Sequence, residues 1–200
     1  AENLLDIAKM HAADGAPEAA VPILRDALAE LRRKVGDRHP LVIDMLRSLC
    51  ALDRATDRLD GAVRHCRESQ SLAEDLHGRD HRASVDANRQ LAALYVDLGR
   101  FSQAESIFLQ TFGWMRSRLD RNHPDLARAY NSLAIVAWER GDIDRALEFQ
   151  QQAVAGWKTG HNDGLTANGL FNLAMILHSA GRDREALPPV QESRALRAKQ

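Results

Sequence analysis

The sequence lacks several features that mark particular classes of protein. It has only two cysteines, 5% aromatic residues and a formal net charge of −1. The cysteines form no C-x-x-C pair and no disulfide framework, so we expect a reducing, cytoplasmic setting. The near-neutral charge argues against a nucleic acid or a membrane surface as the main partner. No apolar run approaches the roughly 18 residues that a membrane span needs.

Catalytic signatures are also missing from the sequence. There is no G-x-G-x-x-G or G-x-x-x-x-G-K-[ST] phosphate loop, no G-x-S-x-G and no H-E-x-x-H. His39, His81 and His123 recur at equal spacing, but one ion with bonds of about 2 Å cannot join three separate repeats. We therefore predict that the chain is not an enzyme and holds no metal and no cofactor.

What the sequence does contain is a repeating unit. Gly99 and Gly141 lie 42 residues apart, and so do Leu91 and Leu133. Each unit is too small to bury its own apolar face, so neighbouring units must cover one another. We expect one domain over residues 1–200. Its five repeats lie at about 1–36, 37–78, 79–120, 121–160 and 161–200.

Each repeat reads as two helices joined by a tight turn. The first helix carries an apolar stripe with a small residue in it, and the second helix carries an alanine at a fixed position. We expect the two helices to cross closely where these small residues meet. The first helix ends at a residue suited to the left-handed conformation: Gly15, Asp57, Gly99, Gly141 or Gly181. The small first-helix residues are Ala8, Cys50, Ala92, Ala134 and Ala174, and the alanines are Ala20, Ala62, Ala104, Ala146 and Ala186.

The segments between repeats carry signals for the start of a helix. Pro40 and Pro124 fit the first helical position, where the missing N–H costs nothing. We interpret the histidines of these segments, such as His39 and His123, as part of the linkers and helix starts.

This pattern resembles the tetratricopeptide repeat, a helix–turn–helix unit with small residues at fixed positions. The period of 42, with His-Pro before the first helix, is similar to the long-repeat branch found in kinesin light chains and many bacterial regulatory proteins. The resemblance implies an all-α fold, an α-α superhelix of five stacked hairpins whose first helices line a concave wall. Asp57 departs from the family's glycine, and Asp53 stands where the family often has a bulky residue.

The two cysteines fall in the second repeat. Cys50 occupies the small first-helix position and Cys66 a core position of the second helix, and these positions face each other across the hairpin. We favour two buried free thiols that act as small apolar side chains. The alternative is a disulfide that joins the two helices, which requires an oxidising compartment.

Helical periodicity identifies the side chains of the concave wall. In repeats two and three these are rich in guanidinium groups, and in repeats four and five they are apolar and aromatic with amides between them. Arginine binds carboxylates, asparagine pairs with a peptide backbone, and large apolar side chains form a pocket for an anchor residue. We therefore predict a site for a peptide with acidic residues and one large apolar residue. The predicted partner-binding residues are Arg47, Arg54, Arg89, Asn131, Ser132, Ile135, Trp138, Phe171, Asn172 and Met175.

The leading interpretation is a non-catalytic protein-binding module within a larger regulatory or scaffold protein. Arginine greatly outnumbers lysine and alanine is abundant, which is typical of a GC-rich bacterial gene. Two alternatives stay open. In the first alternative, the chain is the regulatory region of a Ser/Thr kinase or of a nucleotide-switch ATPase. In the second, it forms homo-oligomers through an end repeat. The Lys/Asn/Arg clamp of co-chaperones that bind heat-shock protein tails is missing, which argues against a chaperone-tail receptor.

Overall fold

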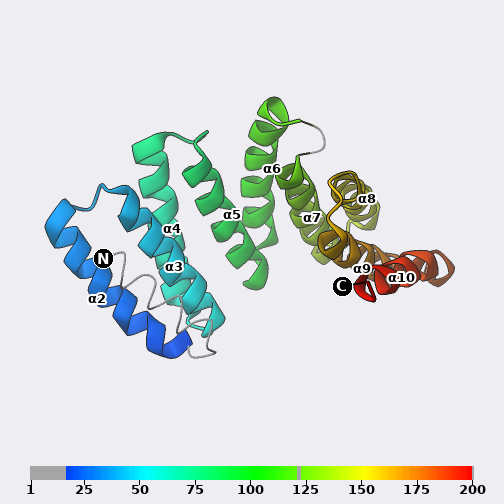
Figure 1. Cartoon of the computed structure of the whole chain (residues 1–200), viewed down its shortest axis with the longest axis horizontal. Coiled ribbons are helices and arrows are strands. Elements are labelled where there is room, and N and C mark those ends of the chain that lie inside the picture. The colour runs from blue at the N-terminus through cyan, green and yellow to red at the C-terminus, as the bar shows by residue number, and fades with distance from the viewer. Residues whose placement is uncertain (1–16, 121–122, 200) are drawn as a thin grey trace. The chain divides into compact units, whose positions relative to one another are not determined.

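A computed structural model describes residues 17–120 and 123–199 (Figure 1). Regular structure within these residues is entirely helical, which confirms the predicted all-α class. The first helix predicted for repeat one lies outside the described residues. The helices are α2 (Pro17–Val35), α3 (Pro40–Ala55), α4 (Leu59–His77), α5 (Arg82–Asp97), α6 (Phe101–Arg118), α7 (Pro124–Glu139), α8 (Ile143–Thr159), α9 (Asp163–Ser179) and α10 (Asp183–Arg197).

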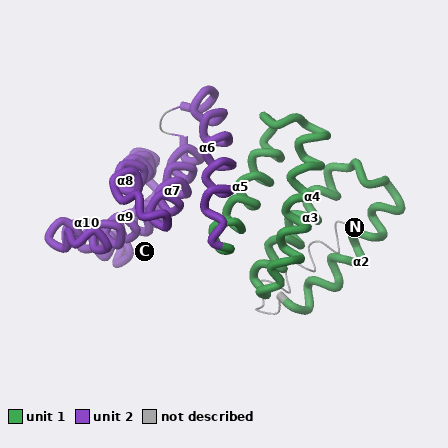
Figure 2. The backbone as a smooth tube through the Cα atoms, turned by 180° about the vertical axis from the view of Figure 1, so that it is seen from behind, with its two compact units in different colours: residues 1–98 green, residues 99–200 purple. Residues whose placement is uncertain are grey.

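The chain divides into two compact units, which Figure 2 shows in different colours. Unit 1 comprises residues 1–98 and unit 2 residues 99–200, so the boundary falls in the turn of the third predicted repeat. Within each unit, helices that follow one another in the sequence pack against each other. The division into five repeats of a single domain stays a prediction.

The predicted helix ends are confirmed where the structure describes them. Gly99, Gly141 and Gly181 have φ angles of 66°, 79° and 70°, and Asp57 has a φ of 55°. These are left-handed conformations, which glycine adopts without a Cβ clash and aspartate tolerates better than most residues. Asp57 therefore adopts, after the end of α3, the left-handed conformation that glycine adopts in the later repeats.

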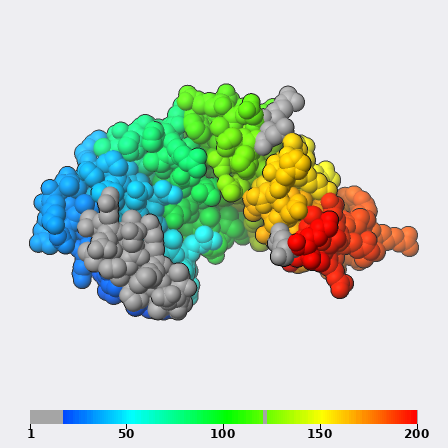
Figure 3. Space-filling view, in the orientation of Figure 1, coloured from blue at the N-terminus to red at the C-terminus, as the bar shows by residue number. Residues whose placement is uncertain are grey.

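The small residues lie where the helices cross. Ala62, Ala104 and Ala146 are 0% exposed, and Ala186 is 8% exposed. A Cβ added to Gly156 of α8 would lie 2.9 Å from the Cβ of Ala127 in α7. Such close approach leaves no room for larger side chains, which is why each hairpin requires small residues at its crossing. Side chains fill the spaces between the ribbons, as Figure 3 shows for the helices of each unit.

Three periodic histidines begin helices, as the sequence indicated. His39 accepts a hydrogen bond at Nδ1 from the backbone N–H of Leu41, and His81 does the same for Ala83, each at 3.2 Å. His123 repeats this contact with the N–H of Asp125, also at 3.2 Å. Each imidazole satisfies one of the N–H groups that a helix start leaves unpaired.

The two cysteines differ from the favoured expectation. Cys50 of α3 and Cys66 of α4 form a disulfide, so the structure holds the alternative instead of two free thiols. Their Cα atoms lie 5.2 Å apart, within the range that a disulfide spans. The physical reason is the close crossing of the hairpin, which places a small first-helix position against a core position of the second helix.

Candidate functional site

The first helices of repeats four and five, α7 and α9, bring two predicted amides together. Asn172 Nδ2 donates to Asn131 Oδ1 at 3.1 Å. The same oxygen accepts a hydrogen bond from Gln150 Nε2 of α8 at 3.2 Å. Gln150 Nε2 also donates to the backbone carbonyl of Gly169 at 3.0 Å. These contacts join α7, α8 and α9 through one chain of amides.

Sequence reasoning did not identify Gln150. Its side chain is 0% exposed, although it is polar and lies on a second helix. A signal was available in the repeat, because Cys66 and Phe108 occupy the matching positions of earlier repeats. An amide at a position that is otherwise apolar indicates a polar partner inside the core.

Large apolar side chains lie on the same two helices. Phe171 and Met175 are 44% and 37% exposed, and their spacing of four residues places them on one face of α9. Ile135 of α7 is half-buried. The guanidinium carbon of Arg197 lies 5.5 Å from the centre of the Phe171 ring, a distance typical of a cation–π contact.

Trp138 and Ser132 are less free than the sequence suggested. Trp138 is half-buried against the core of α7 to α10, and its indole N–H donates to Ser179 Oγ at 2.9 Å. Ser132 Oγ donates to the backbone carbonyl of Arg128 at 3.1 Å. Both side chains therefore have hydrogen-bond partners within unit 2. Phe171 and Met175 are more exposed than Trp138.

In unit 1, the predicted arginines lie on α3 and α5 and are paired with aspartates. Arg54 Nη2 lies 3.0 Å from Asp97 Oδ1. Asp86 contacts Arg89 at 3.3 Å and Arg47 at 3.9 Å. The guanidinium-rich face that the sequence predicted therefore carries matching carboxylates, which the sequence reasoning did not include.

A second charged cluster of unit 1 surrounds a buried carboxylate. Asp53 is 0% exposed, and its Oδ2 lies 2.8 Å from His65 Nδ1. Its Oδ1 faces Arg58 Nε at 3.1 Å and Arg25 Nη2 at 3.6 Å. Burial lowers the pKa of His65, and the neighbouring carboxylate opposes that shift. The cluster joins α2, α3 and α4, which indicates a structural role.

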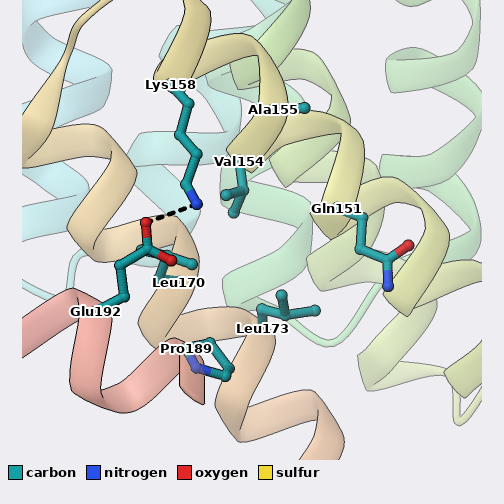
Figure 4. Close-up of a pocket in the computed structure, with 8 residues that line it drawn as sticks. All are labelled: Gln151, Val154, Ala155, Lys158, Leu170, Leu173, Pro189 and Glu192. Carbon is teal, nitrogen blue, oxygen red and sulfur yellow. Dashed lines mark ion pairs between the residues drawn. The ribbon is translucent and has the colours of Figure 1, made fainter. Parts of the chain in front are cut away.

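Helices α8, α9 and α10 surround an apolar hollow of about 340 Å³ (Figure 4). Lys158 of α8 and Glu192 of α10 form an ion pair at 2.6 Å beside it. Its lining does not include any predicted partner-binding residue. The lining residues are Gln151, Val154, Ala155, Lys158, Leu170, Leu173, Pro189 and Glu192.

No cluster of three or more His, Cys, Asp or Glu side chains that could hold a metal ion occurs in residues 17–120 and 123–199. In the same part of the chain, no helix combines the length and the apolar character needed to cross a membrane.

Models of the tetratricopeptide repeat match residues 41–113, 84–159 and 125–199, and a further one matches residues 4–41. The chain belongs to the tetratricopeptide repeat family. This confirms the resemblance read from the repeat pattern, and such repeats generally form non-catalytic scaffolds for protein–protein interaction.

Solved structures show the same fold. Kinesin light chain-like repeats from Podosopora anserina match at 20% identity with a TM-score of 0.83, over 99% of this chain and 95% of that one. BtubC (BKLC) from P. vanneervenii matches at 19% identity with a TM-score of 0.86, over 99% and 80%. A Rap protein complexed with Competence and Sporulation Factor matches at 14% identity with a TM-score of 0.78, over 96% and 52%.

One curated relative is a secreted RxLR effector protein, RXLR-C07, of Plasmopara halstedii. It is 23% identical over 138 residues, which is 69% of this chain. The matched region spans only 42% of the effector's length.

Proposed function

We propose that this tetratricopeptide repeat chain is a non-catalytic module that binds a peptide segment of a partner protein on its first-helix faces. The observation that carries the proposal is the exposure of Phe171 and Met175 on α9, the helix whose Asn172 pairs with Asn131 of α7. Large apolar side chains next to fixed hydrogen-bonding groups are typical of surfaces that hold a ligand. A structural neighbour, the Rap protein, was solved with a bound factor, which supports this use of the fold.

In unit 2, the apolar residues would take the anchor of the peptide. Phe171 and Met175 offer exposed carbon surface on α9, and the half-buried side chains of Ile135 and Trp138 lie on α7. Methionine adapts its shape to different partners, so this surface suits one large apolar side chain without demanding a single residue type.

In unit 1, the arginines would bind acidic residues of the partner. The side chains of Arg89 and Arg54 are 50% and 40% exposed, so their guanidinium groups remain accessible although they pair with aspartates. A carboxylate from the partner would compete with Asp86 and Asp97 for these donors. We expect this part of the binding to weaken with salt, because exposed charges are screened.

The cellular compartment and the parent protein belong to this proposal. We place the chain in the cytoplasm, as a region of a larger bacterial regulatory or scaffold protein. The Cys50–Cys66 disulfide is the observation that argues against a cytosolic setting, since disulfides are rare there. A thiol count on protein alkylated directly in cells of its native host decides between the two compartments.

A selection with random peptides tests the proposed function. Peptides from a random display library would be enriched on the purified chain, and their affinities measured with wild type and with Phe171→Ser. We expect enriched peptides to share a large apolar residue and to lose about tenfold in affinity with the variant. Leu109→Ser is the matched control, because Leu109 is 42% exposed but lies on α6. Equal affinity for wild type and Phe171→Ser would contradict the proposal.

Homo-oligomerisation is a second candidate that one observation favours. Leu187 and Val190 of α10 are 59% and 41% exposed. Their spacing of three residues gives one apolar stripe on the last described helix. Light scattering of wild type and of Leu187→Lys tests this candidate: a concentration-dependent oligomer that the variant abolishes supports it, and a strict monomer excludes it.

A further inference from the structure

The orientation of the amides in unit 2 follows from a single backbone group. The carbonyl of Gly169 can only accept a hydrogen bond, so the atom of Gln150 that lies 3.0 Å away must be its amide nitrogen. That nitrogen also lies 3.2 Å from Asn131, which must therefore present its oxygen. Asn172 lies 3.1 Å from the same oxygen and must present its nitrogen. One fixed carbonyl thus sets the direction of three side-chain amides.

This arrangement leaves one donor and one acceptor on the α7 and α9 face. Asn131 Oδ1 already accepts two hydrogen bonds, and its Nδ2 group is left to donate. Asn172 Nδ2 donates to Asn131, and its Oδ1 is left to accept. Both side chains are half-buried, so each retains access from outside. The donor comes from α7 and the acceptor from α9.

The burial of Gln150 calls for an explanation beyond packing. Its Oε1 is buried and accepts no hydrogen bond from the described residues, which is costly for a polar atom. An apolar residue would fill the same position without that cost, as Cys66 and Phe108 do in earlier repeats. What this position gains with glutamine is the hydrogen bond from Nε2 to Asn131 Oδ1, which an apolar side chain does not make.

We propose that Gln150 is a positioning residue that fixes Asn131 and Asn172 as a directional donor–acceptor pair for one residue of an extended peptide. This inference depends on the proposed function, since it concerns the same peptide. In an extended chain, the N–H and C=O of one residue point to the same side, so both groups can form hydrogen bonds with the same partner. The peptide C=O accepts from Asn131 and its N–H donates to Asn172.

The pair also sets the direction of the bound chain. Because the N–H of a residue precedes its C=O, a peptide held in this way runs from α9 toward α7. The exposed apolar side chains Phe171 and Met175 lie on α9, the helix that carries the acceptor. The apolar anchor of the peptide therefore lies close to the residue whose backbone is held.

Backbone ester substitution tests the inference. The probe is a peptide enriched from the random library, with each backbone N–H replaced in turn by an ester oxygen. We expect one position to lose about tenfold in affinity, the value of one hydrogen bond to a well-placed partner. A flat scan overturns the inference.

Three variants separate positioning from general stability. Asn131→Asp keeps an inward oxygen for Gln150 and Asn172 but replaces the outward donor, so we expect about a tenfold loss for every peptide. Gln150→Leu should reduce the penalty of the critical ester from about tenfold to below about threefold, because Asn131 is no longer held. A purely structural role would leave that penalty unchanged. Gln152→Leu, an exposed position on α8, is the matched control.

Paramagnetic broadening measures the direction of the bound peptide. A nitroxide placed at the N-terminus of the probe peptide should broaden amide resonances of α9 more than those of α7, and a C-terminal nitroxide should do the reverse. The opposite pattern overturns the inference. If no peptide is enriched on wild type, the proposed function fails as well. If peptides bind but the ester scan is flat, only the role of the amide pair is overturned.

Discussion

His65 Nδ1 lies 2.8 Å from Asp53 Oδ2 inside the core of unit 1. Asp53 is completely buried, and its other oxygen faces Arg58 at 3.1 Å. A Cβ added to Gly61 would come within 2.6 Å of Asp53 Oδ2. Gly61 therefore makes room for the carboxylate of Asp53.

We predict that acidification destabilises the chain through His65. Burial lowers the pKa of His65 in the folded state, whereas the unfolded side chain has the ordinary value of about 6.5. As pH falls through that region, the unfolded state binds more protons than the folded state, so the free energy of unfolding decreases. The decrease is about 1.4 kcal/mol for each unit by which the two pKa values differ. Urea unfolding at about pH 7 and about pH 5 measures it.

The control for this prediction is His65→Gln. Glutamine can donate to Asp53 but does not titrate, so the variant should lose less stability between the two pH values than wild type. Contributions from groups other than the residue at position 65 are common to both proteins and cancel in the difference. Equal losses in wild type and variant would show that His65 does not cause the pH dependence.

We predict that reduction of the Cys50–Cys66 disulfide destabilises the chain. The bridge joins residues 16 apart in sequence, and closing a loop of this size in the unfolded state contributes about 3 kcal/mol of stability. Thermal unfolding with and without a phosphine reductant measures the loss. The Cys50→Ala/Cys66→Ala variant should unfold at a temperature that does not depend on the reductant. Two titratable thiols in the denatured, unreduced protein would contradict the bridge.

The repeat architecture could be predicted because it depends on local and periodic signals. The left-handed helix end at Asp57 was predicted from its place in the repeat, without a glycine. The buried small residues, such as Ala134 and Ala146, were predicted from their recurrence in every copy. Such positions obey the same steric rule in each described hairpin, so the recurring copies reveal the rule even when one copy departs from it.

The candidate site was only partly predictable, because side-chain pairing does not follow the period. Arg54 was predicted on the first helix of its repeat and lies in α3, but its partner Asp97 belongs to the next repeat. Gln150 lies on a second helix and reaches the face only through Asn131. The repeat pattern indicated that Cys50 and Cys66 face each other across the hairpin. It did not give the distance between them, so it could not decide between free thiols and a disulfide.

We predict that the histidine at the start of α7 stabilises unit 2. His123 Nδ1 accepts from the backbone N–H of Asp125 at 3.2 Å. His123→Ala removes this acceptor, and the loss of a helix cap costs about 1 kcal/mol. His123→Asn should retain most of the stability, since its side-chain oxygen can accept from the same region of the helix. Urea unfolding measures both variants, and an alanine variant as stable as wild type would exclude a capping role.

We predict opposite effects for two glycine-to-alanine substitutions in unit 2. A Cβ at Gly169 of α9 would lie 2.6 Å from Trp157 Cζ3, and the ring is buried and cannot move freely. Gly169→Ala should therefore destabilise by about 1–3 kcal/mol. A Cβ at Gly113, inside α6, meets no atom within 4 Å. Gly113→Ala should stabilise by about 0.5–1 kcal/mol, because alanine loses less freedom in a helix. Thermal unfolding compares the two, and effects of the same sign would contradict the close packing of α9 against Trp157.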